Sequence, residues 1–267
     1  MKFKPKMLSL TIAGLLLAGC NATNQTEVQN AKNSALQHLS IPQGALIPVS
    51  KTVPHPSEMN VDVVASGRVS TLKSVDVVKV GKNIPYTYSE GRVNNTPGFD
   101  WYVSKHFALN SNRPEDQVLL YMELLESSFP HYIELFGMTP PDLENTRMAA
   151  VYGSSKKETA IFVPDDNITR GISAGGEAMF YNLVGYSFPS AREQHQRYIV
   201  VHEQGHVFQM ALMDYSGWLP TWFTEGTADA LAHHYYDPEK KQLKVMVFDR
   251  ASPMDYIRRG LREYEKL

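Results

Sequence analysis

The stretch HEQGH, residues His202 to His206, and the stretch EGTAD, residues Glu225 to Asp229, decide how this chain is interpreted. On a helix, positions i and i+4 lie on one face, so the two imidazoles of the first stretch can converge on one metal ion. Glu203 lies one position round the helix, where its carboxylate can face a metal-bound water. Two neutral nitrogen ligands, a third protein ligand and a carboxylate base are the minimal equipment of a zinc hydrolase.

The residues around HEQGH predict a buried helix. An apolar run from Arg197 to Val201 precedes the motif, another from Val207 to Leu212 follows it, and no proline interrupts either run. The helix is expected to end between Asp214 and Pro220. Two histidines and a glutamate in so apolar a helix are costly to bury without partners. A metal ion is a partner that satisfies all of them.

A second helix is expected to carry EGTAD, because the Ala and Leu content from Glu225 to Ala232 favours helix and proline is absent. Glu225 and Asp229 then share one face. We expect Glu225 to bind the metal directly and Asp229 to accept the free ring N–H of a ligating histidine, which fixes its tautomer and raises its basicity. The alternative is that both acids are solvated on a surface helix. Their position downstream of the histidine pair favours the metal site.

The two segments Ile199 to Met210 and Pro220 to Leu231 resemble the gluzincin zinc metallopeptidases, and most closely their peptidase-MA-like branch. The resemblance implies an α+β domain with an upstream β-rich section and two active-site helices. It also implies one Zn²⁺ per chain, held by His202, His206 and Glu225. In the same pattern Glu203 is the catalytic base, and Asp229 hydrogen-bonds to a ligating histidine.

A looser likeness to such domains reaches upstream to about Phe99. Alternation of apolar and polar residues predicts a strand from Trp101 to Leu109. Pro114 opens a helix that continues to about Phe136, and another strand follows from Met148 to Gly153. Before them, short runs of β-branched residues predict a small β-rich section over residues 59–98, which is either a separate unit or an edge of the main domain.

The first nineteen residues read as a lipoprotein signal peptide. Their apolar run from Leu10 to Ala18 is too short to span a bilayer. It leads into LAGC, which looks like a bacterial lipobox, so we expect Cys20 to become the lipidated N-terminus. A free thiol in the core is the alternative, and it fits poorly because small residues precede this lone cysteine as they would a cleavage site. Asn21 after the cysteine resembles outer-membrane signals, so the expected location is the bacterial cell envelope, on the outer membrane facing the periplasm.

Residues 20–58 are rich in Asn, Gln, Ser, Thr and Pro and are expected to form a tether between the lipid and the domain. Removing the signal peptide takes away three lysines and no acid, which leaves 23 basic against 28 acidic residues and a net charge of −5. No basic stripe suggests a nucleic-acid partner. A single cysteine excludes an intramolecular disulfide.

Several further residues are candidates for the site. Glu177 lies in a Gly-rich stretch where several gluzincins have an edge strand that pairs with the substrate backbone, so it is either a substrate contact or a solvated loop carboxylate. His233 falls roughly on the face of Glu225, although a capping or surface role is favoured. Gluzincins commonly add a residue that stabilises the oxyanion, and the eligible tyrosines are Tyr181, Tyr186, Tyr235, Tyr236 and Tyr256.

The expected peptidase domain covers residues 99–267. Its last segment, Met254 to Leu267, reads as a charged amphipathic helix without a clear C-cap. Many gluzincins continue further beyond the third ligand, so either this domain is compact or the chain is incomplete at its C-terminus.

The sequence therefore predicts a lipid-anchored zinc peptidase that hydrolyses peptide bonds of a peptide or protein substrate through a zinc-activated water, with Glu203 as general base. One alternative is a binding or assembly lipoprotein that keeps the fold and the zinc without turnover. Another is a zinc hydrolase of a non-peptide bond. The intact Glu203 argues against the first, because a purely structural zinc site needs no base and normally has a fourth protein ligand. Nothing in the sequence excludes the second.

Overall fold

The computed structural model describes residues 52–90, 93, 97–160, 175–179, 182–213 and 219–246. The expected signal peptide, Cys20, the tether before residue 52 and the expected C-terminal helix lie outside the described residues, as do Tyr181 and Tyr256.

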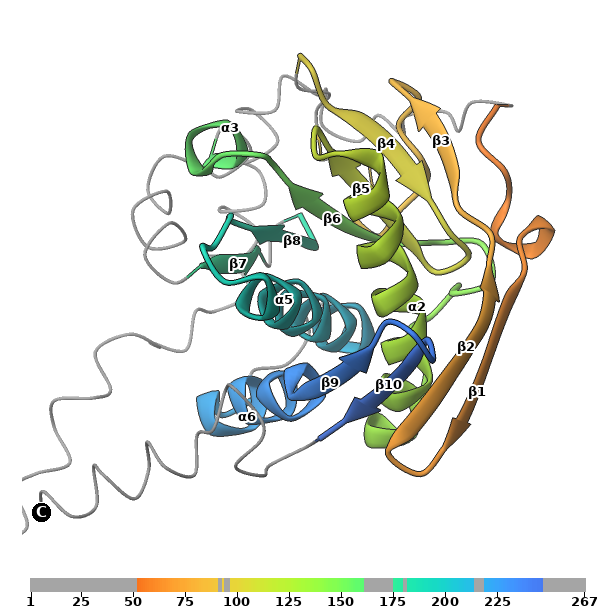
Figure 1. Ribbon diagram of the computed structural model, residues 1–267, viewed down its shortest axis with the longest axis vertical. Helices are drawn as coiled ribbons and strands as arrows, with labels where there is room; N and C mark the ends of the chain where they lie inside the picture. The colour runs from red at the N-terminus through yellow and green to blue at the C-terminus, as the bar shows by residue number, and fades with distance from the viewer. Residues whose placement is uncertain are drawn as a thin grey trace, which may run out of the picture.

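The described chain is an α+β structure with two sheets (Figure 1). Its elements are η1 Pro56–Glu58, β1 Val61–Ser66, β2 Val69–Val75, β3 Val78–Gly81, β4 Asp100–Val103, β5 Phe107–Ser111, α2 Glu115–Phe136, β6 Met148–Tyr152, α3 Lys156–Ala160, β7 Gly176–Met179, β8 Val184–Ser187, α5 Glu193–Met213, α6 Thr221–Ala232, β9 His234–Asp237 and β10 Gln242–Val245.

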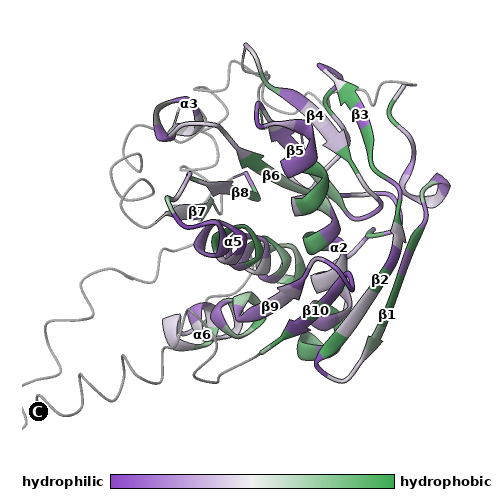
Figure 2. Cartoon of the chain, viewed as in Figure 1, coloured by the Kyte–Doolittle hydropathy of each residue, from purple (hydrophilic) through white to green (hydrophobic). Residues whose placement is uncertain are grey.

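The larger sheet has six strands in the order β3-β4-β5-β6-β8-β7. Strands β5, β6 and β8 are parallel, and the outer strands run antiparallel to their neighbours. Every residue of β6 is buried, and Figure 2 shows hydrophobic colouring along it. Such a continuous apolar run is typical of a strand that is covered on both faces.

Helices α2 and α5 cover one face of this sheet. Phe107 and Leu109 of β5 pack with residues of these helices in the main core, whereas Ala108 belongs to the apolar cluster on the opposite face. This follows from the pleat, which sends successive side chains of a strand to opposite faces. Helix α5, which carries HEQGH, contacts β6, β8 and β7, so it lies across the end of the sheet where β7 is the edge strand.

The helix predicted from Pro114 to about Phe136 is confirmed, with Pro114 at its N-cap and Gly137 in a left-handed conformation at its C-cap. The strand predicted after Met148 is also confirmed. None of the described helices is long and apolar enough to cross a membrane.

The prediction of one strand from Trp101 to Leu109 is wrong. The segment forms the antiparallel strands β4 and β5, joined by a turn in which the N–H of Ser104 donates to the carbonyl of Phe107 at 3.0 Å. The turn is held from a distance, because the fully buried Glu126 of α2 accepts the backbone N–H of His106 at 2.8 Å. Alternating residues fit a hairpin as well as a single strand. The contact with Glu126 comes from a distant helix, so the local pattern could not place the turn.

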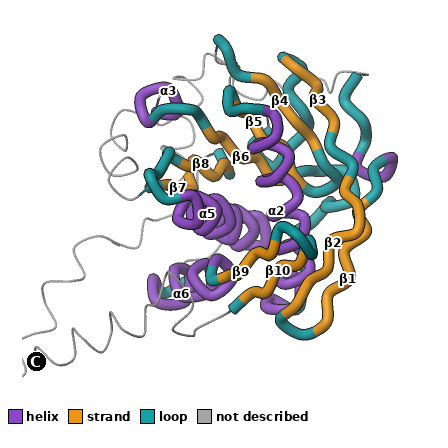
Figure 3. The backbone as a smooth tube through the Cα atoms, viewed as in Figure 1, coloured by secondary structure: helices purple, strands orange, loops and turns teal. Residues whose placement is uncertain are grey.

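The second sheet has four antiparallel strands in the order β1-β2-β10-β9. Strands β1 and β2 come from the expected β-rich section, and β3 from the same section pairs with β4 of the larger sheet. That section therefore contributes strands to both sheets. Helix α2 contacts β5 on one side and β1, β2 and β10 on the other, so it lies between the two sheets (Figure 3).

Residues 52–58, which were expected to be the end of the tether, are already packed against the domain. Val53 and Pro56 are buried, and η1 begins with a capping box formed by His55 and Glu58. The buried guanidinium of Arg147 donates to the carbonyl of Pro54 at 2.7 Å. Residues 52–58 thus belong to the domain, which the polar composition alone did not indicate.

Candidate metal centre

Helices α5 and α6 lie side by side and carry the candidate ligands together with Glu203 and Asp229 (Figure 1). Their backbones approach closely where Gly205 meets Ala228, because a Cβ added to Gly205 would lie 3.4 Å from the Ala228 Cα. Both helices bring their motif to this contact: His202 and His206 are one turn apart on α5, and Glu225 lies in the first part of α6. The close approach lets short side chains from two helices reach one point.

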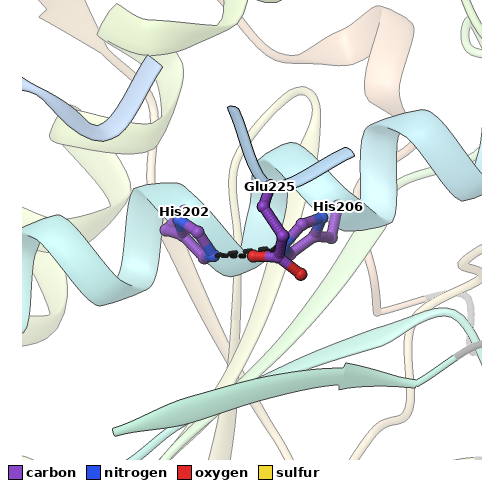
Figure 4. A group of neighbouring side chains, drawn as sticks. All are labelled: His202, His206 and Glu225. Carbon is purple, nitrogen blue, oxygen red and sulfur yellow. Dashed lines mark hydrogen bonds and ion pairs between the residues drawn. The ribbon is translucent and has the colours of Figure 1, made fainter. Parts of the chain in front are cut away.

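Three ligand atoms converge there (Figure 4). The Nε2 atoms of His202 and His206 are 3.0 Å apart, and each lies 3.4 Å from Oε2 of Glu225. Zinc bonds of about 2.0 Å at tetrahedral angles would separate two ligand atoms by about 3.3 Å. The observed separations are close to that value, so this group could hold a metal ion.

The charges around the ligands favour a cation. Burial of His202 by itself lowers its pKa, but hydrogen bonds to Asp229 and Glu225 outweigh burial and raise the pKa to about 10. Hydrogen bonds from His202 and His206 lower the pKa of Glu225. The site therefore keeps its carboxylate ionised and stabilises positive charge between the two helices.

Glu203 points toward the sheet edge rather than toward α6. Only 4% of it is exposed, and a Cβ added to Gly176 of β7 would lie 2.6 Å from its Oε1. Burial raises the pKa of Glu203, opposed by the neighbouring His202 and His206. A backbone hydrogen bond from Ala178 reaches this carboxyl group, but its Oε2 has no partner among the described residues. Buried oxygens are normally paired, so this one is available to accept a hydrogen bond from a bound group.

Two glycines make room for α5 against the sheet edge. A Cβ on Gly185 of β8 would lie 2.4 Å from Nε2 of Gln204, and the one on Gly176 would meet Glu203 as described above. A side chain at either position would force these side chains of α5 to shift. These glycines were not singled out by sequence reasoning, since the contact depends on how α5 packs on β7 and β8.

Asp229 lies behind the ligand set. Its Oδ1 is 3.0 Å from Nδ1 of His202, on the side of the ring opposite to the ligand atom. Burial raises the pKa of Asp229, but hydrogen bonds from His202 and Tyr198 outweigh it and lower the pKa overall. An ionised carboxylate at this place holds the proton on Nδ1 and leaves Nε2 free to bind a metal.

Tyr198 is part of the site and was missed by sequence reasoning. Its hydroxyl donates to Oδ1 of Asp229, and its ring stacks on His202 with centroids 5.7 Å apart. The available signal was its spacing, four residues before His202 and therefore on the same face of α5. His233 is buried at the C-cap of α6, where its Nδ1 lies 2.6 Å from the carbonyl of Asp229.

The structure does not bring Glu177 to the ligands. In β7, Gly176 and Ala178 face α5, so Glu177 points to the opposite face of the sheet, next to its register partner Tyr186. Tyr186 is fully buried on that face and accepts a hydrogen bond from Asn182 at 2.7 Å. Of the other candidate tyrosines, Tyr235 on β9 is 53% exposed and Tyr236 packs against the core.

The structure thus brings together His202, His206, Glu225 and Asp229, with Glu203 between the two histidines on α5. The site is built from two helices and a glycine-containing sheet edge. Comparison of the chain with protein-family models, with curated proteins and with solved structures found no match.

Proposed function

We propose that this chain is a zinc-dependent hydrolase of peptide bonds with gluzincin-like architecture. The observation that carries the proposal is the convergence of three ligand atoms, 3.0 to 3.4 Å apart, beside the buried and partnerless Oε2 of Glu203. A purely structural site would close the fourth position with another protein ligand and would have no need of this carboxylate.

The donor set suits zinc, which binds imidazole nitrogen and carboxylate oxygen readily. Zinc bound here would supply a Lewis acid that lowers the pKa of a water and polarises a carbonyl group. His202 and His206 contribute their Nε2 lone pairs, and Glu225 contributes Oε2 and one negative charge. Asp229 keeps the proton of His202 on Nδ1, so that the ring binds in one tautomer and one orientation.

Glu203 would move the proton. Its burial raises its pKa, which brings a carboxylate closer to the range where it can both accept and return a proton. In the proposed reaction Glu203 accepts a proton from the attacking water and returns it to the nitrogen of the leaving amine. The lipid expected on Cys20 would hold this activity at the bacterial envelope membrane, with the tether between lipid and domain.

The test combines metal content with turnover. The purified protein should hold about one zinc per chain and should cleave members of a peptide library in a chelator-sensitive way. Glu203→Gln keeps the shape of the side chain but cannot accept the proton. Zinc content should therefore stay parental while turnover falls by roughly two to four orders of magnitude.

Glu193→Gln is the matched control, because Glu193 lies on the same helix but its side chain is 70% exposed and pairs with Arg197 in the first turns. It should be as active as the parent. A Glu203→Gln protein with parental turnover contradicts the proposed mechanism. A parent with bound zinc that cleaves neither peptide nor ester libraries favours a binding lipoprotein, and cleavage of esters alone favours a hydrolase of another bond.

A further inference from the structure

Tyr198 and the metal ligand His202 share one carboxylate oxygen. Oδ1 of Asp229 accepts a hydrogen bond from the hydroxyl of Tyr198 and lies 3.0 Å from Nδ1 of His202. Both donors come from α5, one turn apart, and the acceptor comes from α6. The tyrosine therefore contacts the carboxylate that orients the ligand, without touching the position that a metal would take.

The ring of Tyr198 is fixed on several sides. It stacks on His202, with centroids 5.7 Å apart and planes inclined by 28°, and on His195 at 6.2 Å on α5. His233 meets it edge-on at 5.6 Å. Only 3% of Tyr198 is exposed. A ring held in this way places its hydroxyl at one point with little freedom, so the hydroxyl can impose a position on its acceptor.

Asp229 needs such a constraint, because its side chain is 34% exposed. A half-exposed carboxylate bonded by one donor can rotate and exchange that bond for water. With Tyr198 and His202 at the same oxygen, rotation breaks the hydrogen bond from the Tyr198 hydroxyl and also the 3.0 Å ion-pair contact with Nδ1 of His202. The arrangement thus favours the one rotamer in which Oδ1 faces Nδ1 of His202.

We propose that Tyr198 is a positioning residue of the metal centre: it holds Asp229 against His202 and thereby sets the orientation and tautomer in which His202 binds the metal. The proposal rests on the metal site of the proposed function and is independent of whether the protein cleaves peptides. Tyr198 acts through Asp229, so its contribution depends on that carboxylate.

Zinc affinity of the full chain, measured by competition with a chromophoric chelator, tests this role. Tyr198→Phe keeps the stacked ring and removes only the hydroxyl, so zinc should bind about 10-fold more weakly, at the lower end of the loss expected for a partner behind a ligand. The visible spectrum of the cobalt(II)-substituted protein should change as well, because it reports on ligand geometry. Asp229→Asn should weaken zinc binding by about 10- to 100-fold. In that background, Tyr198→Phe should change zinc affinity by no more than about twofold.

Tyr132→Phe is the matched control. The hydroxyl of Tyr132 is also buried and donates to α5, to the carbonyl of Val201 at 2.9 Å, but it does not reach Asp229. This variant should lower the Tm of the metal-free protein and leave zinc affinity within about twofold of the parent.

Three results would overturn the proposal. Parental zinc affinity and an unchanged cobalt spectrum in Tyr198→Phe would show that the hydroxyl does not matter. An equal loss of affinity in Tyr132→Phe would show a general loosening of α5. Additive losses in the Tyr198→Phe, Asp229→Asn double variant would exclude the route through Asp229. If the parent itself binds no zinc, the metal site fails together with this role, whereas zinc binding without peptide cleavage contradicts only the proposed activity.

Discussion

Two clusters among the described residues combine histidine with buried glutamate, and they differ in how their polar atoms are satisfied. In the cluster at the β4–β5 turn, Glu126 uses both carboxyl oxygens within the chain: Oε1 accepts the N–H of His106 at 2.8 Å, and Oε2 lies 2.7 Å from its Nδ1. The ring of His106 stacks on Phe129 with centroids 3.9 Å apart. In the cluster on α5 and α6, by contrast, ligand atoms point at one another and Glu203 keeps an oxygen without a partner among the described residues.

The difference teaches which of two chemically similar clusters is a site. Buried polar groups in proteins are normally paired, and a cluster that pairs all its groups internally stabilises the fold and has nothing left to bind with. A cluster whose ligand atoms converge, with a carboxylate beside them, gains stability when a cation occupies the centre. Residue type does not separate the two cases, whereas the hydrogen-bond partners do.

Of the changes considered, removal of the candidate ligands should have the largest effect on metal binding. We expect His202→Ala, His206→Ala and the double variant to lose most of the bound zinc, because a site with too few ligands cannot offset the desolvation of the ion. Metal analysis after dialysis measures it. His106→Ala, from the closed cluster, is the control and should keep about one zinc per chain. Full occupancy in the double variant would mean that the two helices do not form the site.

A smaller effect is expected from moving the base without touching the ligands. In Gly176→Ala the new methyl group would lie 2.6 Å from both Oε1 of Glu203 and Cγ2 of Ile199, so both side chains, including the carboxylate, must shift. Displacement of a catalytic group by about 1 Å can cost on the order of 100-fold, so kcat/KM should fall by about 10- to 100-fold while zinc stays bound.

Gly226→Ala provides the matched comparison for that experiment. Gly226 adjoins the candidate ligand Glu225, and a Cβ there meets nothing within 4 Å. Alanine also favours helix, so this variant should be as active as the parent and slightly more stable. Equal activity of Gly176→Ala and the parent on a substrate both cleave would show that the β7 edge does not position Glu203.

The smallest effect on the metal should come from the closed cluster. Glu126→Ala removes the acceptor of two buried contacts to His106, so the free energy of unfolding should fall by about 3 kcal/mol. Zinc affinity should change by no more than about twofold, because the two clusters share no partner. Urea unfolding of the metal-free protein and a zinc titration measure the two quantities. A loss of zinc affinity comparable with that of Asp229→Asn would erase the distinction between the clusters.

Local patterns predicted those parts of the molecule whose geometry follows from helical spacing. His202, His206, Glu225 and Asp229 could be placed on two helix faces because i and i+4 residues are neighbours on any helix. The start of α2 next to Pro114 could be predicted for another local reason, because the restricted geometry of proline favours the beginning of a helix. Zinc, peptide cleavage and the lipid on Cys20 stay predictions.

Features that depend on contacts between distant segments could not be predicted. The β4–β5 turn is held by Glu126, which is 20 residues away in the chain, and Tyr198 bonds Asp229 across 31 residues. The direction of Glu177 depends on which of its neighbours in β7 faces α5, and the sequence of a short edge strand does not decide that. In each case the position of a residue depends on a contact with a segment that is distant in the chain, and not on the local sequence.

The pairing of β2 with β10 has a consequence for how the protein forms. It joins Thr71 to Gln242, so most of the domain must be made before the four-stranded sheet can close. Bringing such distant segments together is entropically costly and slow. Glu225 follows both histidines and precedes β10 in the chain, so the full set of candidate ligands is made before the four-stranded sheet can close. A nascent chain would therefore carry both histidines before the third candidate ligand is made, and β2 would have no β10 partner until the end of the described domain is made.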